Sequence, residues 1–87
     1  MKPYTQKRKG NEIIREFSNQ VNSMELVWHR DAKDRVIEIL EGDGWKFQLD
    51  NQLPVELKKG DKFQIQKEVY HRIQRGNTNL KIKITEK

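Results

Sequence analysis

Apolar and polar side chains alternate with a period of two along most of the chain after residue 25. The alternation is clearest over residues 45–50 and 80–84, where every second side chain is large and apolar. This spacing is typical of a β-strand that buries one face and leaves the other in water. No stretch longer than about two turns shows the period of 3.6 residues that an amphipathic helix requires. The pattern therefore predicts an all-β protein.

Turn-forming segments separate the alternating stretches at intervals of about eight to twelve residues, which is typical of a sandwich or barrel of six or seven short strands. Gly42 and Gly44 fall between two of these stretches. They predict a tight hairpin there, because glycine readily adopts the positive φ that such a turn needs. The strands are expected at residues 26–30, 35–40, 45–50, 62–66, 69–75 and 80–84.

Length and composition restrict the kind of protein. A chain of 87 residues forms one domain. It has no cysteine, which excludes disulfides and thiolate metal ligands. No apolar stretch approaches the roughly 20 residues of a membrane-spanning helix, and none follows the basic N-terminus as a signal peptide would require. By default, we expect a cytoplasmic protein.

Positive charge is concentrated at the N-terminus. Residues 1–10 contain four basic residues and no acidic one, which leaves fourteen basic against thirteen acidic residues in the rest of the chain. Pro3, Gly10 and Asn11 interrupt regular structure in this segment. We therefore expect a flexible basic arm at residues 1–11 and a single β-domain at residues 12–87. The arm is either solvated or makes weak, non-specific contacts with nucleic-acid phosphates.

The chain has two histidines, His29 and His71, and each lies in an expected strand. By parity, His71 shares the apolar face of residues 69–73, and His29 shares its face with Asp31. Both imidazoles are therefore expected to point into the domain. Two histidines and one carboxylate suit Fe(II), Mn(II), Ni(II) or Zn(II) and leave coordination positions open for a substrate. Alternatively, each imidazole is simply hydrogen-bonded within the core.

Residues 28–72 resemble the two consecutive sequence motifs of the cupin family, in the stretches "WHRDAKDRVIEILEGDGW" and "GDKFQIQKEVYHR". The match is to His29 and Asp31, at the two histidine positions of the first motif, and to His71, at the histidine of the second. The resemblance implies a small cupin-type, jelly-roll-like β-barrel with a divalent transition metal at these three residues. Many cupins form homodimers, so a homodimer is implied as well.

The resemblance fails at the glutamate ligand of the first motif, where this chain has Arg35. A guanidinium cannot coordinate a metal. Asp31 could supply an oxygen ligand in place of a histidine, or it could pair with Arg35 and remove the need for a metal. Asp34 could replace the missing glutamate only if a bulge turned it inward.

Several large side chains suggest contacts beyond the histidines. Trp45, Phe47 and Phe63 are expected on the inner face, where they and Arg35 would line a pocket for a small organic ligand. Alternatively, the aromatic residues only fill the core. Trp28 and Tyr70 have the opposite parity from the histidines, as residues of a sheet–sheet contact or a dimer interface would.

Three functions remain open from the sequence. The first is a metal-binding cupin, either an enzyme or an inactive relative. The second is a metal-free module that binds a small molecule or another protein. The third is an OB-type barrel that binds nucleic acid and uses the basic arm. No catalytic residue is assigned, because the chain lacks a Gly-rich phosphate loop, a G-x-S-x-G turn and an H-E-x-x-H motif.

Overall fold

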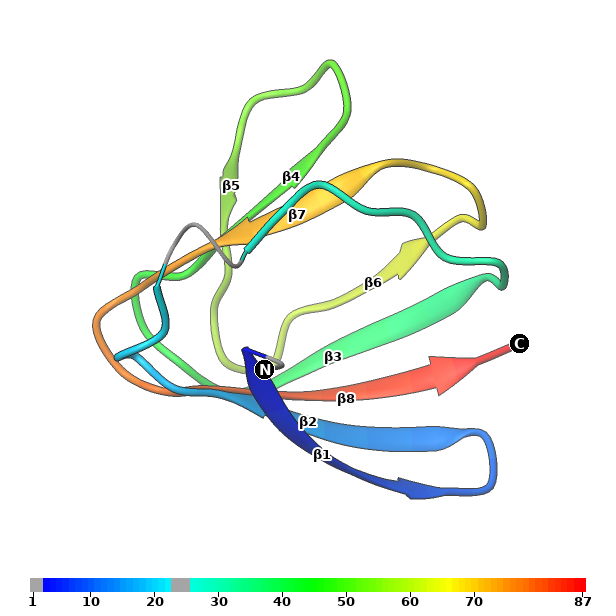
Figure 1. Ribbon diagram of the computed structural model, residues 1–87, viewed down its shortest axis with the longest axis horizontal. Coiled ribbons are helices and arrows are strands. Elements are labelled where there is room, and N and C mark those ends of the chain that lie inside the picture. The colour runs from blue at the N-terminus through cyan, green and yellow to red at the C-terminus, as the bar shows by residue number, and fades with distance from the viewer. Residues whose placement is uncertain (1–2, 23–25) are drawn as a thin grey trace.

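The structure is a computed structural model that describes residues 3–22 and 26–87. The described residues form strands and loops, and no helix among them is long and apolar enough to cross a membrane. The strands make two antiparallel sheets (Figure 1). The larger sheet contains, in spatial order, β1 (Tyr4–Lys9), β2 (Glu12–Phe17), β8 (Leu80–Glu86), β3 (Arg35–Glu41) and β6 (Lys62–Ile65). The smaller sheet contains β5 (Val55–Glu56), β4 (Lys46–Leu49) and β7 (His71–Gln74).

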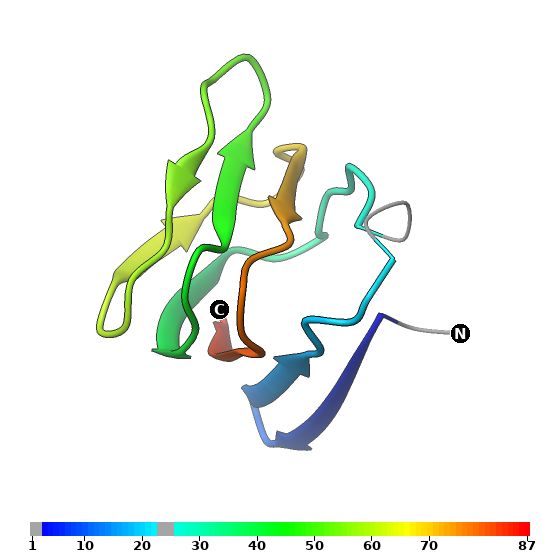
Figure 2. The same ribbon diagram turned by 90° about the vertical axis from the view of Figure 1, so that its left-hand side faces the viewer.

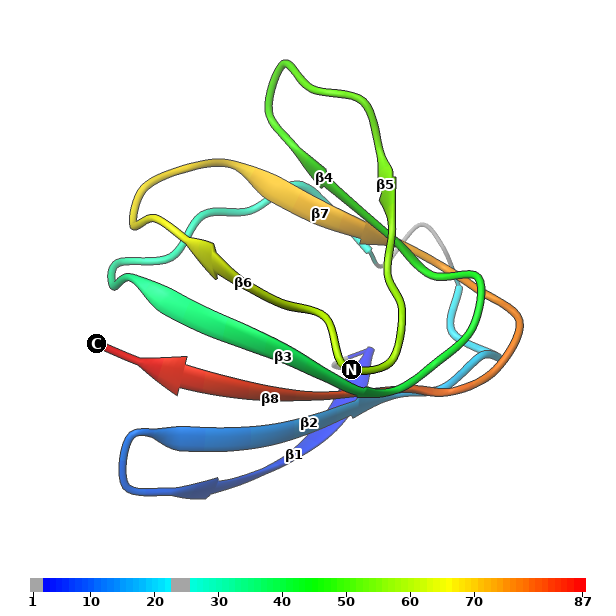
Figure 3. The same cartoon turned by 180° about the vertical axis from the view of Figure 1, so that it is seen from behind.

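The two sheets enclose one apolar core. Figures 2 and 3 show the smaller sheet standing over the larger one, which curves beneath it. In β8 every second side chain is buried and the intervening ones are only half-buried, as the alternation of the sequence predicts. The fully buried side chains of largest volume are Trp45, Ile13, Ile39, Leu80 and Ile84. The predicted all-β, jelly-roll-like architecture is confirmed, although hydrogen bonds do not join the two sheets into a closed barrel.

The N-terminal segment differs from the expected flexible arm, because Tyr4–Lys9 form strand β1 at the edge of the larger sheet. Side-chain contacts of β1 with the neighbouring strands are consistent with the pairing. Tyr4 packs on Phe17 with ring centroids 5.2 Å apart, and the Arg8 guanidinium lies 2.9 Å from the Glu86 carboxylate. This strand was not predicted from the sequence because a basic segment is usually solvated, and its composition does not indicate these contacts.

Two other expectations about local structure are wrong. Residues 26–30 do not form a strand, since this irregular segment makes one isolated bridge, between His29 and His71. Gly42 and Gly44 do not close a hairpin, because β3 and β4 belong to different sheets. They carry the chain across from one sheet to the other. A side chain at Gly42 would collide with Leu80, since a Cβ there would lie 2.8 Å from Leu80 Cδ1.

Candidate metal centre and ligand cavity

A cavity of about 340 Å³ lies between the two sheets. Pockets that bind small molecules usually measure about 300–1,000 Å³, so this cavity has room for a small ligand. Aliphatic and aromatic side chains from both sheets make up most of its wall. The charged residues and the histidines of the wall are Arg15, His29, Asp31, Arg35 and His71.

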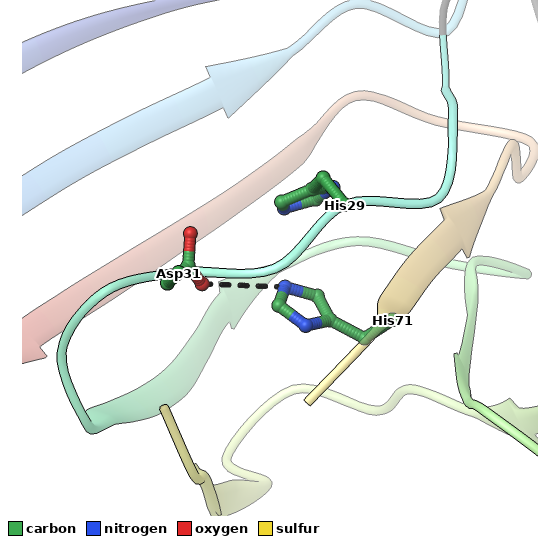
Figure 4. A group of neighbouring side chains, drawn as sticks. All are labelled: His29, Asp31 and His71. Atoms are coloured by element: carbon green, nitrogen blue, oxygen red, sulfur yellow. Dashed lines mark ion pairs between the residues drawn. The ribbon is translucent and has the colours of Figure 1, made fainter. Parts of the chain in front are cut away.

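Three of these residues lie close together in the cavity wall, and Figure 4 shows the side chains of His29, Asp31 and His71 next to one another. The backbones of His29 and His71 exchange two hydrogen bonds, of 3.0 and 2.9 Å, which hold the irregular segment against the first residue of β7. As a result, the two imidazole centroids lie 4.3 Å apart. Asp31 follows two residues later, and one ligand atom each from His29, Asp31 and His71 lies within 4.8 Å of the other two.

The ring of His71 has a defined orientation. Its Nδ1 lies 2.9 Å from the carbonyl oxygen of Val69. Because a carbonyl oxygen only accepts, Nδ1 must carry the proton and donate it. Burial lowers the pKa of His71 from its ordinary value, and the neighbouring His29 lowers it further against the opposing effect of the Val69 carbonyl. In the neutral ring, Nε2 therefore presents a lone pair to the cavity.

The same arrangement recurs at His29. Its Nδ1 lies 3.2 Å from the carbonyl oxygen of Val27, again two residues earlier in the chain. In the neutral imidazole this hydrogen bond leaves Nε2 as the electron-pair donor. A backbone carbonyl that binds the second ring nitrogen is the usual support of a metal-ligating histidine, because it sets the tautomer and orients the ring.

Asp31 completes the group. Its Oδ1 lies 3.2 Å from Arg35 Nη1, but its Oδ2 is buried without a hydrogen-bond partner among the described residues. That Oδ2 faces His71 Nε2 at 3.4 Å. A carboxylate oxygen and an imidazole lone pair repel each other unless a cation or a proton lies between them. The donor set therefore fits a divalent transition metal.

Arg35 lies behind this group, in an ion-pair network rather than in a coordinating position. Its Nη2 lies 2.8 Å from Glu86 Oε2, and Glu86 also pairs with Arg8. The expected Asp31–Arg35 pair is therefore present, and it leaves Asp31 Oδ2 without a hydrogen bond among the described residues, at 3.4 Å from His71 Nε2. Asp34 is not turned inward, because its side chain accepts a hydrogen bond of 2.7 Å from the Lys67 backbone.

The predicted pocket residues separate into two groups. Arg35, Phe47 and Phe63 line the cavity, and the two phenyl rings pack with centroids 4.9 Å apart. Trp45 does not line it. Trp45 is completely buried and its Nε1 donates a 2.6 Å hydrogen bond to the Thr78 carbonyl, so its assignment to the pocket is wrong. Both the cavity and the core lie inward of the sheets, and strand parity does not distinguish between them.

Sequence reasoning missed Arg15, which lines the cavity from β2. Parity could have identified it, since Arg15 lies between Ile13 and Phe17, which are both buried.

Trp28 and Tyr70 are 39% and 44% exposed. Parity does not explain the exposure of Trp28, because residues 26–30 form no strand and Val27 and His29 on either side of it are exposed too. Of the two imidazoles expected to point inward, His71 is buried, whereas His29 lines the cavity but is exposed.

The Glu86 network makes a testable prediction about pH. Hydrogen bonds from Arg35 and then Arg8 lower the pKa of Glu86 below its ordinary value of 4.5. A carboxylate whose pKa is lower in the folded than in the unfolded state stabilises the fold above the unfolded pKa and loses this effect as the pH falls. We expect Glu86→Gln to lower the Tm by about 5–10 °C at pH 6 and by progressively less below about pH 4.5.

Thermal melts of the wild type and Glu86→Gln from pH 7 to pH 3 measure this difference. The control is Glu12→Gln, because Glu12 pairs with Lys83 at the surface, where its side chain is 51% exposed. An exposed ion pair of this kind contributes little to the stability of the fold. A Glu86→Gln effect that stays constant across the pH range would contradict the network.

Comparison with known proteins gives the fold a family context. No family model matches the sequence, and no curated protein matches it significantly. A cupin-2 domain containing protein from Shewanella frigidimarina NCIMB 400 is similar in structure, with a TM-score of 0.69 and 21% identity over 95% of this chain and 80% of that one. A putative mannose-6-phosphate isomerase from Ralstonia eutropha JMP134 has a TM-score of 0.70 and 15% identity over 95% and 81% of the two chains.

A third similar structure is FeII HppE, with a TM-score of 0.71 and 14% identity. This chain aligns over 97% of its own length and covers 48% of HppE. At these identities the likeness concerns the fold. The arrangement of the two sheets and the agreement with these structures lead to one conclusion: this chain has the fold of the cupin superfamily.

Proposed function

We propose that this protein binds a divalent transition metal through His29, Asp31 and His71 and takes up a small organic ligand in the adjoining cavity. The observation that carries the proposal is the buried Asp31 Oδ2, which faces His71 Nε2 at 3.4 Å without a hydrogen bond. Two imidazoles and one carboxylate suit Fe(II), Mn(II), Ni(II) or Zn(II). Bound there, such a metal would polarise a ligand oxygen and keep positions open for it.

The residues around the three ligands support this use. The carbonyls of Val27 and Val69 hold the imidazoles with Nε2 toward the cavity, and Arg35 fixes the other oxygen of Asp31. The apolar wall next to the group, which includes Phe47 and Phe63, would exclude water from a bound ligand. Likeness to the iron-containing HppE structure agrees with a metal in this fold, although that protein is only 14% identical.

Metal content tests the proposal directly. Protein purified without chelator is expected to contain close to one transition-metal ion per chain by elemental analysis. In His71→Ala this content is expected to fall to background, with an unchanged far-UV circular dichroism spectrum. The matched control is Trp28→Ala, an exposed residue of the same irregular segment, which is expected to keep the metal. Equal metal content in His71→Ala and the wild type would exclude the site.

A metal-free binding module is the second candidate, and the ion pair between Asp31 and Arg35 favours it. That pair already neutralises the aspartate. This candidate predicts that the protein binds no metal stoichiometrically after exposure to Zn(II) or Ni(II). The nucleic-acid candidate depended on an OB-type barrel, and the cupin fold removes that basis.

A further inference from the structure

The inner face of β2 carries a charged residue that the metal proposal does not use. Arg15 lies between Ile13 and Phe17, which are both buried, and opposite Gln6 of β1 and Ile82 of β8. Its side chain lines the same cavity as the three proposed metal ligands. A guanidinium remains protonated in proteins, so this part of the cavity wall is positively charged.

The contacts of Arg15 are all with uncharged groups. Its Nε and Nη2 donate hydrogen bonds of 3.0 and 2.8 Å to one acceptor, the Gln6 side-chain oxygen. Its Cζ lies 3.9 Å from the centroid of the Tyr4 ring. Desolvation by burial disfavours the charged form and lowers the pKa of Arg15. Its Nη1 makes no hydrogen bond within the described parts of the chain.

The two neighbouring arginines of the inner face differ from Arg15 in this respect. Arg35 pairs with the carboxylates of Asp31 and Glu86, and Arg8 pairs with Glu86. Among the described residues, no carboxylate lies within ion-pair distance of Arg15. A partly buried cation without an anionic partner is costly, and an anion that enters the cavity would remove that cost.

We infer that the ligand of this cavity is a small organic acid whose carboxylate binds Arg15. This inference deepens the proposed function, because it rests on the cavity being a ligand site. Gln6 accepts from Nε and from one N–H of Nη2, so both N–H groups of Nη1 and the second N–H of Nη2 remain to bind the two oxygens of a carboxylate. The apolar wall formed by residues such as Phe47 and Ile82 suits the hydrocarbon part of such an acid.

Binding of acetate, benzoate and succinate, each compared with its neutral amide, tests the inference. The protein is first stripped of metal and the chelator removed, so that coordination to a metal cannot favour the acids. Calorimetry is expected to show at least one acid binding about 10- to 100-fold more tightly than its amide, as a charge-assisted hydrogen bond implies. The Nε–H resonance of Arg15 is expected to shift with saturation by that acid.

Two variants decide whether Arg15 is responsible. Arg15→Gln is expected to remove the preference for the acid, whereas Lys7→Gln, which removes one positive charge from the outer face of β1, is expected to keep it. If Arg15→Gln does not fold, the shift of the Arg15 Nε–H resonance in the wild type remains as the test.

Three results would overturn the inference. In the first, no acid binds more tightly than its amide. In the second, Arg15→Gln keeps the same preference for the acid as the wild type. In the third, inorganic phosphate binds in an Arg15-dependent way and the organic acids do not bind. Each is distinguishable from failure of the metal proposal, which is measured by metal content and not by acid binding. Metal without Arg15-dependent acid binding leaves the metal proposal standing, and the reverse result leaves the organic-acid inference standing.

Discussion

In Asp31→Asn, divalent metal is expected to lose most of its stabilising effect. At a free metal concentration of about 100 times Kd, a ligand that binds only the folded state adds about 2.7 kcal/mol. For a domain of this size that raises the Tm by about 10–20 °C. Replacing a ligating carboxylate by a neutral amide is expected to weaken metal binding by at least about 100-fold, beyond the usual effect of a supporting residue. The same metal concentration then raises the Tm by about 2–3 °C.

The Tm of Asp31→Asn in the absence of metal serves as an internal control. The new amide can donate a hydrogen bond to His71 Nε2, and Arg35 keeps its pair with Glu86, so the Tm without metal is expected to change little. Differential scanning calorimetry with and without Ni(II) or Zn(II) measures both effects. The control is Glu68→Gln, whose carboxylate is 55% exposed, and it should respond to metal like the wild type. A full metal-induced shift in Asp31→Asn would show that the cation binds elsewhere.

Trp45→Ala is expected to lower the free energy of unfolding by about 3–5 kcal/mol, as is usual for the loss of a buried large aromatic side chain. Trp45 is completely buried and donates a hydrogen bond to the Thr78 carbonyl. Its ring packs against Phe17, with the two ring centroids 5.9 Å apart. The total free energy of unfolding of a small domain is only about 5–15 kcal/mol, so the variant should be close to unfolding at room temperature. Urea denaturation at low temperature measures the loss.

Two further variants separate a core role from a ligand-binding role. Trp45→Phe keeps most of the packing and loses the hydrogen bond to Thr78, at a cost of about 1–3 kcal/mol. Because Trp45 does not line the cavity, this variant is expected to keep wild-type metal affinity. Trp28→Ala is the exposed control and is expected to cost less than about 1 kcal/mol. A changed metal affinity in Trp45→Phe would mean that the tryptophan belongs to the site after all.

The strands that the sequence predicted best are those with strict alternation. In β8, Leu80, Ile82 and Ile84 are all buried, as expected. The inward direction of His71 was also predictable, because it follows from the apolar residues two positions away. Parity within a strand is a local property, since successive side chains point to opposite faces whatever the strand pairs with.

The position of Asp31 shows where local reasoning was insufficient. The sequence suggested that Asp31 lies near His29 and pairs with Arg35, and both are so. The expected reason was a regular strand, which this segment does not form. A single bridge to His71 brings the aspartate into place instead, and such a contact over more than 40 residues has no local signature.

By itself, therefore, the sequence determined an all-β fold, the faces of the regular strands and the identity of three residues that could share a metal. The tertiary structure alone decided that β3 and β4 belong to different sheets and that β1 is a strand. It also placed Trp45 in the core and Arg15 at the cavity. The physical reason is that the alternation of apolar and polar residues indicates which face of a strand is buried. The residues that this face contacts depend on the pairing of strands far apart in the sequence.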